Sequence, residues 1–553
     1  MKKWQLLHES EETDVAKIIS ILLGNRGIAD QERVKEFLNP SFDSLILENT
    51  DIDQSELKTA GRIIKKAISQ KDSIVVYTDY DVDGLCGGAI VWECLYNLGA
   101  KVMPYVPDRV EEGYGLSKKG IDTICEKYKV KLLITVDHGV TAASKIEYAR
   151  SLGIETIILD HHLLPKDLPK VSSLIHTTKM CAGGISFFFA HYLYSFFNRK
   201  ISKNTFLDLA ALATVADLVP LTGLNRNLVK YGLLELNKRG RVGLKALVEA
   251  SCLNKPNLEV YDISFILAPR INAIGRLAHA IDALRLLCTK DADRAIKLSK
   301  CLCDFNRERQ VLTKDSTLQA IEMVRKESFT KLLFISNKDF QEGVLGLIAG
   351  KLVDEFYRPA IVVSVGPEIS KASARSIAGF NIVEAIRSAS DLVIDVGGHP
   401  MAAGFTVKTA NLEALKIRLL EHAALNLKDN NFIKAVKIDL PLKTENINFD
   451  FFEEISKFSP FGMGNPEPVF LTRNLEVAGV RFLGKEKKHI KITMTGRGES
   501  GQNVILSGIG FNMGDLFHKI NPKQGIDVVY SIDKDDWGGR GCLQLKIKDV
   551  NLC

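Results

Sequence analysis

The chain lacks the features of a secreted, disulfide-stabilised or membrane-spanning protein. Its ten cysteines include no Cys-x-x-Cys pair, so free thiols in a reducing compartment, the cytoplasm, are expected. The first residues, MKKWQLLHESEE, contain no apolar core of a signal peptide. The most apolar stretch, residues 184–197, is interrupted by His191 and is too short to span a bilayer. We therefore expect a buried helix there and no membrane partner.

Internal repeats, low-complexity tracts and a strong charge imbalance are also absent. The net charge of +6 permits nucleic-acid binding through local patches but does not establish it. A hydrophobic content of 46% and a charged content of 25% are ordinary for a globular protein. At 553 residues the chain is too long for one hydrophobic core, so several domains are expected.

What the sequence does contain is an acidic cluster after each of three successive predicted strands. The strands are expected at residues 73–77, 131–136 and 155–159. The polar residues that follow them are, in chain order, Asp79, Asp81 and Asp83, then Asp137, then Asp160, His161 and His162. Short apolar strands that alternate with helix-length segments predict a parallel sheet covered on both faces. Because the carboxyl ends of parallel strands meet at one edge, these side chains should converge there.

So many carboxylates in one place predict a metal centre. Like charges at short range raise one another's pKa, and divalent cations relieve that repulsion. Oxygen ligands with one or two imidazoles suit magnesium or manganese, and two ions that share an aspartate can activate water for phosphoryl displacement. An EF-hand is excluded, because a strand precedes the motif and no Glu occupies the twelfth loop position. For the first cluster alone, an acidic turn is the alternative.

The strings around these residues resemble the DHH phosphoesterase superfamily, and in particular its RecJ branch. The matching strings are DYDVDG at 79–84, TVD at 135–137, DHH at 160–162, ATVADLVPL at 213–221 and LAPRINAIGRL at 267–277. By this resemblance, Asp217 is one more metal-ligating aspartate. Three positions depart from the RecJ pattern: Thr78 replaces a Gly, His138 an Asn, and Phe340-Gln341 a Trp-His pair.

Two strings in the second half, KASARS at 371–376 and GGHPMAAGF at 397–405, resemble the DHHA1 domain. Paired glycines let the backbone approach a ligand closely, and Arg, Ser and His can donate to phosphate oxygens. By resemblance, Ser373, Arg375 and His399 hold a 5′-phosphate, and we expect them in two loops after neighbouring strands. For the glycine pair and His399 alone, a tight turn is the alternative.

The expected fold is α/β, with a parallel-sheet DHH domain and an α/β DHHA1 domain joined by a long helix, and a C-terminal OB-like β-barrel. The expected parts are a helical arm at 1–60, the DHH domain at 61–285, the connecting helix at 286–328, the DHHA1 domain at 329–430 and the OB-like domain at 431–553. Residues 291–327 contain neither Gly nor Pro, which predicts one helix about 55 Å long. Two shorter helices with a kink are the alternative.

After residue 430 the pattern changes to strands and turns. Five strands, the number in an OB barrel, are expected at 476–483, 489–494, 503–510, 526–532 and 543–548. Four basic residues are candidates for nucleic-acid binding: Arg473, Arg481, Lys487 and Lys488. Beside Phe482 and Trp537 they suit a groove that follows the backbone and stacks bases. A solvated charged face is the alternative.

The resemblance implies a metal-dependent exonuclease that degrades single-stranded DNA from 5′ to 3′ in DNA repair and recombination. Two Mn²⁺ or Mg²⁺ ions would be divided between Asp81 and Asp83, with Asp79 beside them. Asp137 would bridge the ions, and His161 and Asp217 would complete the second site.

Other residues would act on the DNA. His162 would contact the scissile phosphate, and Asp160 would orient the imidazoles. Arg109 and Arg276 would neutralise phosphate charge. The resemblance further implies a monomer that works with single-strand-binding protein and a helicase. The alternatives are a hydrolase of small phosphoesters, such as short oligonucleotides, cyclic dinucleotides or pyrophosphate, and an inactive single-strand-binding scaffold.

Overall fold

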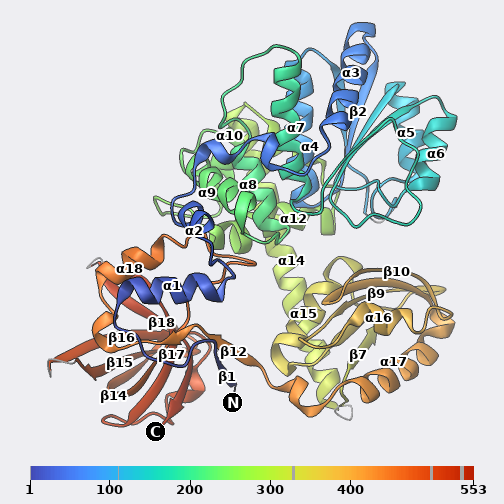
Figure 1. Cartoon of the computed structure of the whole chain (residues 1–553). Coiled ribbons are helices and arrows are strands. Elements are labelled where there is room, and N and C mark those ends of the chain that lie inside the picture. Colours follow the sequence, from blue (N-terminus) through green and yellow to red (C-terminus); the bar gives the residue numbers. More distant parts are fainter. Residues whose placement is uncertain (1, 110, 327–329, 499–501, 536–540) are drawn as a thin grey trace. The chain divides into compact units, whose positions relative to one another are not determined.

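The structure is a computed structural model that describes residues 2–109, 111–326, 330–498, 502–535 and 541–553. The chain forms two compact units, coloured along the sequence in Figure 1. We call Thr50–Val219 with Tyr231–Lys434 the central unit. Met1–Asn49, Pro220–Lys230 and Ala435–Cys553 form the terminal unit.

The central unit begins with α3 (Gln54–Gln70) and a five-stranded parallel sheet of order β3-β2-β4-β5-β6. The strands are β2 (Ser73–Thr78), β3 (Lys101–Tyr105), β4 (Leu132–Val136), β5 (Glu155–Asp160) and β6 (Ser173–His176). Every residue of β2 and β4 is buried, as expected for strands covered on both faces. The parallel sheet is thereby confirmed. Sequence reasoning did not identify the edge strands β3, which contains Pro104, and β6, which has only four residues.

Helices cover both faces of this sheet. Ile121 of α5 (Lys118–Tyr128) and Ile146 of α6 (Ala143–Ser151) share one core cluster with Val75 and Leu133 of the strands. On the opposite side, α4 (Val82–Asn97) packs against β2 and against α7 (Ala182–Phe196) (Figure 1). The predicted buried helix at 184–197 is therefore confirmed as α7.

A helical region follows the sheet and ends in the long helix. Its helices are α8 (Leu207–Ala216), α9 (Gly223–Asn237), α10 (Val242–Ala250), α11 (Val260–Asp262), a π-helical turn at Ile263–Leu267, α12 (Ala268–Leu277), α13 (Ile281–Cys288) and α14 (Ala292–Lys326). The 35 residues of α14 form one helix, so the kinked alternative was wrong.

A second, mixed sheet of order β10-β11-β9-β8-β7 completes the central unit. Its elements are β7 (Leu333–Asn337), α15 (Leu345–Phe356), β8 (Ala360–Ser364), β9 (Ile369–Arg375), α16 (Ile382–Arg387), β10 (Val393–His399), β11 (Ala402–Lys408) and α17 (Leu412–Asn426). The expectation that Ser373, Arg375 and His399 lie in loops was wrong. Ser373 and Arg375 lie on β9, whose alternate residues pack into the core. His399 lies at the end of β10.

The terminal unit is built on a sheet of order β13-β14-β15-β16-β18-β17, which an additional pairing of β14 with β17 closes into a barrel. Its elements are β13 (Leu440–Pro441), α18 (Phe449–Ser456), β14 (Phe470–Leu483), β15 (His489–Arg497), β16 (Asn503–Gly510), β17 (Gly525–Asp535) and β18 (Cys542–Leu552). Each of the five predicted strands lies within one of β14–β18.

The first residues of the chain belong to this barrel unit. The strand β1 (Lys3–Leu6) pairs in parallel with β12 (Ala435–Ile438). Ile18 of α1 (Val15–Asn25) and Phe37 of α2 (Gln31–Leu38) are buried in the same core cluster as Phe470 of β14. Across the described part of the chain, we find no helix long and apolar enough to cross a membrane.

Candidate metal centre

The first acidic cluster is held where β2 ends and α4 begins. Asp81 is the N-cap of α4, and its Oδ1 accepts hydrogen bonds from the backbone N–H of Asp83 (2.9 Å) and Gly84 (3.1 Å). A Cβ atom at position 84 would lie 2.7 Å from the Cβ of Asp79, so this close approach requires a glycine. The sequence Asp-x-Asp-x-Asp-Gly therefore places three carboxylates around one helix start.

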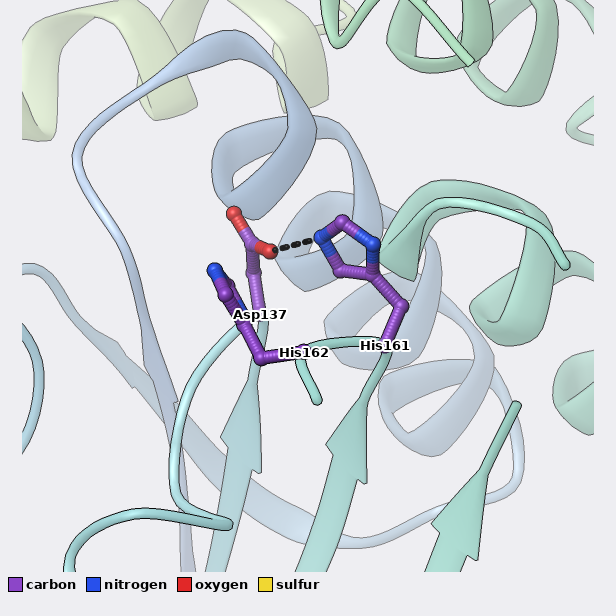
Figure 2. A group of neighbouring side chains, drawn as sticks. All are labelled: Asp137, His161 and His162. Carbon is purple, nitrogen blue, oxygen red and sulfur yellow. Dashed lines mark hydrogen bonds and ion pairs between the residues drawn. The ribbon is translucent and has the colours of Figure 1, made fainter. Parts of the chain in front are cut away.

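The second and third clusters meet at the ends of β4 and β5. Asp137 adopts the left-handed backbone conformation (φ 70°) and is buried, with 3% of its surface exposed. Its Oδ1 lies 3.1 Å from Nε2 of His161. Figure 2 shows the two side chains pointing toward one another from neighbouring strand ends, with His162 beside them. The predicted convergence at one sheet edge is thus present in the structure.

Three groups of side chains bring their ligand atoms within 4.8 Å of one another. They are Asp79, Asp81 and Asp137; Asp83, His161 and Asp217; and Asp137, His161 and His162. The first two groups share no residue, but the short contact between Asp137 and His161 joins them. The six residues proposed as metal ligands from the sequence therefore lie in one continuous cluster.

The electrostatics of the cluster require positive charge. Burial, reinforced by the neighbouring carboxylates, raises the pKa of Asp79, Asp81 and Asp137. Burial together with Asp83 and Asp81 raises the pKa of Asp217 to about 9. Oδ1 of Asp79 is buried and accepts no hydrogen bond from any described residue. Divalent cations would stabilise these ionised carboxylates and give the Asp79 oxygen a partner, so the donor set fits magnesium or manganese.

Asp83 is oriented by a segment that sequence reasoning did not assign to the site. Its two carboxylate oxygens accept hydrogen bonds from the backbone N–H groups of Ala182 (2.8 Å) and Gly183 (2.7 Å), at the start of α7. A Cβ at position 183 would lie 2.4 Å from the Cβ of Ala213. The double glycine at 183–184 is the only signal in the sequence, and glycines are too common for it to identify this contact.

Asn272 is a second residue whose role sequence reasoning did not identify. It lies in the string at 267–277 that resembles the RecJ branch. Its Oδ1 accepts a hydrogen bond of 3.0 Å from the backbone N–H of Val82, the first residue of α4. The side chain thus ties α12 to the helix start that carries Asp81 and Asp83.

Asp160 positions His162. One carboxylate oxygen lies 2.7 Å from Nδ1 of His162, and the other accepts a hydrogen bond from the backbone N–H of Val140 (3.0 Å). Burial opposes ionisation of Asp160, but the hydrogen bond and charge of His162 lower the pKa of Asp160 to about 2. The Asp160 carboxylate also accepts a hydrogen bond from the backbone N–H of His161 (2.8 Å). The ring of His161 contacts other carboxylates of the cluster instead of Asp160.

Tyr114, which sequence reasoning also missed, contacts the other side of His162. Its hydroxyl lies 3.2 Å from Nε2 of His162 and donates to the backbone oxygen of Asp137 (3.2 Å). The residue remains 54% exposed, so the ring faces solvent beside the metal cluster while the hydroxyl points inward. No motif marks this tyrosine, because it comes from a loop between β3 and α5.

Two arginines, Arg109 and Arg276, lie near the carboxylates of the cluster. The guanidinium of Arg109 lies 5.0 Å from the ring centre of Tyr80, and Nη1 of Arg276 donates to the backbone oxygen of Gly343 (2.9 Å). Burial, with the charges of Arg109, Arg309 and Arg375, lowers the pKa of Arg276 to about 10. Among the described residues, none of these four arginines forms an ion pair with a carboxylate. Positive charge without a partner suits a polyanionic ligand.

The three phosphate-binding candidates share one face of the second sheet. Arg375 on β9 and His399 on β10 both pair with Ala402 on β11, the strand between them. The side chains of Arg375 and His399 therefore project from the same side of the sheet, and so does that of Ser373, two residues before Arg375. Ser373 pairs with Gly404, and a Cβ added at Gly346 of α15 would lie 3.0 Å from its Oγ and 2.9 Å from Nη2 of Arg375. Gly346 thus leaves the space that Ser373 and Arg375 occupy, because a larger residue there would collide with both.

The four basic residues of the barrel proposed to bind nucleic acid do not form one compact group. Lys487 lies 5.7 Å from the ring centre of Phe482, which stacks on Phe517. Lys488 forms an ion pair with Glu486, which offsets its charge. Arg473 lies roughly 26 Å along β14 from Arg481, at about 3.3 Å per residue, so the structure does not bring these two together. Trp537 lies outside the described residues.

The three departures from the RecJ pattern leave the cluster intact. Thr78 is accommodated by Gly88 of α4, where a Cβ would lie 2.0 Å from the Cγ2 of Thr78. His138 is buried against Tyr77, and burial lowers the pKa of His138 to about 4. Phe340 is also buried.

Family models match three parts of the chain. The DHH family N-terminal domain matches residues 73–214, the DHHA1 domain residues 329–424, and the RecJ OB domain residues 438–549.

Individual relatives extend the match to nearly the whole chain. The single-stranded-DNA-specific exonuclease RecJ of Bacillus subtilis is 37% identical, over 98% of this chain and 69% of the relative. That of Thermus thermophilus is 32% identical, over 94% and 73%. The crystal structure of Thermus thermophilus RecJ with Mn²⁺ superposes with a TM-score of 0.83 at 28% identity, covering 99% of this chain and 79% of that one. Its Mg²⁺ complex gives a TM-score of 0.77 at 27% identity, covering 99% and 78%. This chain belongs to the RecJ family.

Proposed function

We propose that this chain is a metal-dependent exonuclease that degrades single-stranded DNA from 5′ to 3′, in DNA repair and recombination. The observation that carries the proposal is the joined pair of ligand groups, in which His161 of one lies 3.1 Å from Asp137 of the other. Such a pair suits a two-metal phosphodiester hydrolase. The relatives named as single-stranded-DNA-specific exonucleases supply the substrate and the reaction class.

Two ions, Mn²⁺ or Mg²⁺, would be held by the two groups. Asp79, Asp81 and Asp137 would hold one ion, and Asp83, His161 and Asp217 the other, with Asp137 bridging them. When bound, such ions supply an activated water and neutralise the charge that develops on the phosphate. Asp83 is kept in place for this by the backbone N–H groups that start α7.

The protein's own groups would position the DNA. Asp160 holds Nδ1 of His162, which leaves Nε2, beside the Tyr114 hydroxyl, as the ring atom that meets the scissile phosphate. Arg276 and Arg109 would neutralise that phosphate or its neighbour, since no carboxylate among the described residues pairs with either.

The 5′ end would be recognised on the second sheet. A terminal phosphate has more charge and more free oxygens than an internal diester. Ser373, Arg375 and His399, which share one face, would bind it. The planar fork of Arg375 matches phosphate oxygens in a way that lysine cannot reproduce.

The proposal extends to partners and location. Beside single-stranded DNA, we propose single-strand-binding protein and a helicase as partners, and a monomer as the working form. Ten free cysteines support the cytoplasm as the compartment.

A long single-stranded DNA, labelled at either its 5′ or its 3′ end, tests the proposal with purified protein and Mn²⁺. The label at the 5′ end should be released in the first products, and that at the 3′ end only in the last. Release of the 3′ label first would show degradation from 3′ to 5′ and would contradict the proposed polarity. A dinucleotide cleaved faster than the long strand would favour a hydrolase of small phosphoesters instead.

A further inference from the structure

A second pocket lies in the central unit, away from the metal cluster. It has a volume of about 500 Å³ and is formed by β3, α4, the end of α5, α13 and the start of α14. Trp92 of α4 is one of its walls, nine residues beyond Asp83 and therefore roughly 14 Å farther along that helix. The volume is within the range of about 300–1,000 Å³ that is usual for small-molecule sites.

The wall of this pocket is aromatic and apolar. Trp92, Tyr105 and Tyr128 line it together with buried aliphatic residues such as Leu284. Nε1 of Trp92 is buried and donates to no described residue. A buried N–H group without an acceptor is costly, and an acceptor atom on a ligand would satisfy it. The wall therefore suits a flat ring that carries hydrogen-bond acceptors.

The rim of the pocket is basic. Lys127 and Arg294 are exposed there, and neither forms an ion pair with a carboxylate of the described residues. Arg285 is also at the rim, but it pairs with Asp282 at 2.7 Å. Among the described residues that line the pocket, none is acidic. The rim therefore suits an anion such as a phosphate.

The strand that lines the pocket, β3, favours a compact ligand over an extended peptide. β3 lies at the edge of its sheet. A peptide that added a strand there would have to form hydrogen bonds with the outward-facing backbone N–H and C=O groups of β3. Pro104 is the fourth of the five residues of β3 and has no N–H group to donate. An extended acidic peptide would thus lack a regular ladder of hydrogen bonds at this edge.

We propose that this pocket binds a nucleoside monophosphate, with the base against Trp92, Tyr105 and Tyr128 and the phosphate at Lys127 and Arg294. Aromatic side chains stack on any base, and unpaired cations take the phosphate. This is a binding site separate from the metal cluster and from Ser373, Arg375 and His399. It rests on the pocket itself and stands even if the proposed exonuclease reaction fails.

Equilibrium binding of 2′-deoxyadenosine 5′-monophosphate to the full chain tests this, by calorimetry with EDTA present so that no metal contributes. Trp92→Phe keeps an aromatic ring but removes the N–H group, and should weaken binding about fivefold. Arg294→Ala should weaken it about tenfold. Deoxyadenosine and inorganic phosphate alone should each bind more weakly than the nucleotide.

Three variants serve as controls. Arg307→Ala removes an exposed arginine of the same helix that is paired with Asp304. Asp137→Asn alters the metal cluster, and Arg375→Ala alters the second sheet. All three should bind the nucleotide as the wild type does.

Loss of binding in Arg375→Ala, with Arg294→Ala unaffected, would overturn the proposal, and so would the absence of nucleotide binding. Tighter binding of an acidic peptide than of the nucleotide would overturn it as well. If Trp92→Phe does not fold, the exposed Arg294 and Lys127 decide the question.

Discussion

The acidic cluster of the parallel sheet is spread over the sequence but gathered in space, whereas the basic residues of the barrel are close in the sequence and do not gather in space. Asp79, Asp137 and His161 come from three strand ends separated by helices, and they meet because parallel strands end at one edge. Arg473 and Arg481 are eight residues apart on one strand and remain far apart.

The two regions also differ in how their charges are balanced. In the acidic cluster, burial and repulsion raise the pKa of several carboxylates, and divalent cations would stabilise their ionised forms. In the barrel, Lys488 is paired with Glu486, and Lys491 lies 3.5 Å from Asp535. Single substitutions should therefore have large effects at the sheet edge and small effects on the barrel.

The largest effect is expected for Asp137→Asn. Removing the carboxylate that we propose as the bridge should lower the rate of single-stranded DNA hydrolysis by more than about a thousandfold, equivalent to about 4 kcal/mol of activation free energy. Asn is the suitable replacement, because it tolerates the left-handed backbone conformation of position 137. The metal-free variant should unfold at a temperature no lower than the wild type, since carboxylate repulsion is reduced.

Asp122→Asn is the matched control, because Asp122 is a carboxylate of the same unit that bonds Tyr148 at 2.6 Å, away from the cluster. Its activity should equal that of the wild type. Hydrolysis by Asp137→Asn within a few-fold of the wild type would rule out the bridging role.

Sequence reasoning succeeded where local pattern determines position. The strand, turn and helix of residues 73–97 place Asp79, Asp81 and Asp83 around one helix start. It failed where tertiary contacts decide. Tyr114 reaches the cluster from a loop that no motif marks, and Asn272 lies in a matched string that does not reveal which backbone group its side chain contacts.

Two further differences between the expected and the observed structure also arise from tertiary contacts. Residues 369–375 contain small and polar residues that suggest a loop, but pairing on both sides makes them a strand. Residues 1–60 were expected to form a helical arm, yet Ile18 and Phe37 are buried in the barrel core. Both outcomes depend on contacts with residues far away in the sequence, which a local reading does not reveal.

The second largest effect is expected for Arg375→Lys. This variant keeps the charge but loses the planar fork, so the preference for 5′-phosphorylated over 5′-hydroxyl DNA should fall about tenfold. Competition between the two substrates in one reaction measures this. Arg387→Lys, on α16 of the same sheet domain, is the control and should keep the full preference. An undiminished preference in Arg375→Lys would contradict the assignment.

The smallest effect is expected in the barrel. Lys487→Ala removes a cation beside Phe482, and should weaken binding to a long single strand about threefold and reduce the salt slope by about 0.7. Arg473→Ala, nine residues before Phe482 on β14, should change neither. Equal losses in both variants would show that the barrel binds DNA through a diffuse charged face.

Deleting the chain after residue 430 would not test the barrel cleanly. Ile18, Leu22 and Phe37 would lose the core in which they are buried, and the remaining protein would expose them. Point substitutions at exposed positions avoid this difficulty.

The central claim is that one sheet edge holds two ions bridged by Asp137. Crystals grown with Mn²⁺ and measured at the manganese absorption edge test it most directly. Two anomalous peaks should lie on either side of the Asp137 carboxylate, one beside Asp79 and Asp81 and the other beside Asp83, His161 and Asp217. A single peak, or two peaks of which one lies away from Asp137, would contradict the account.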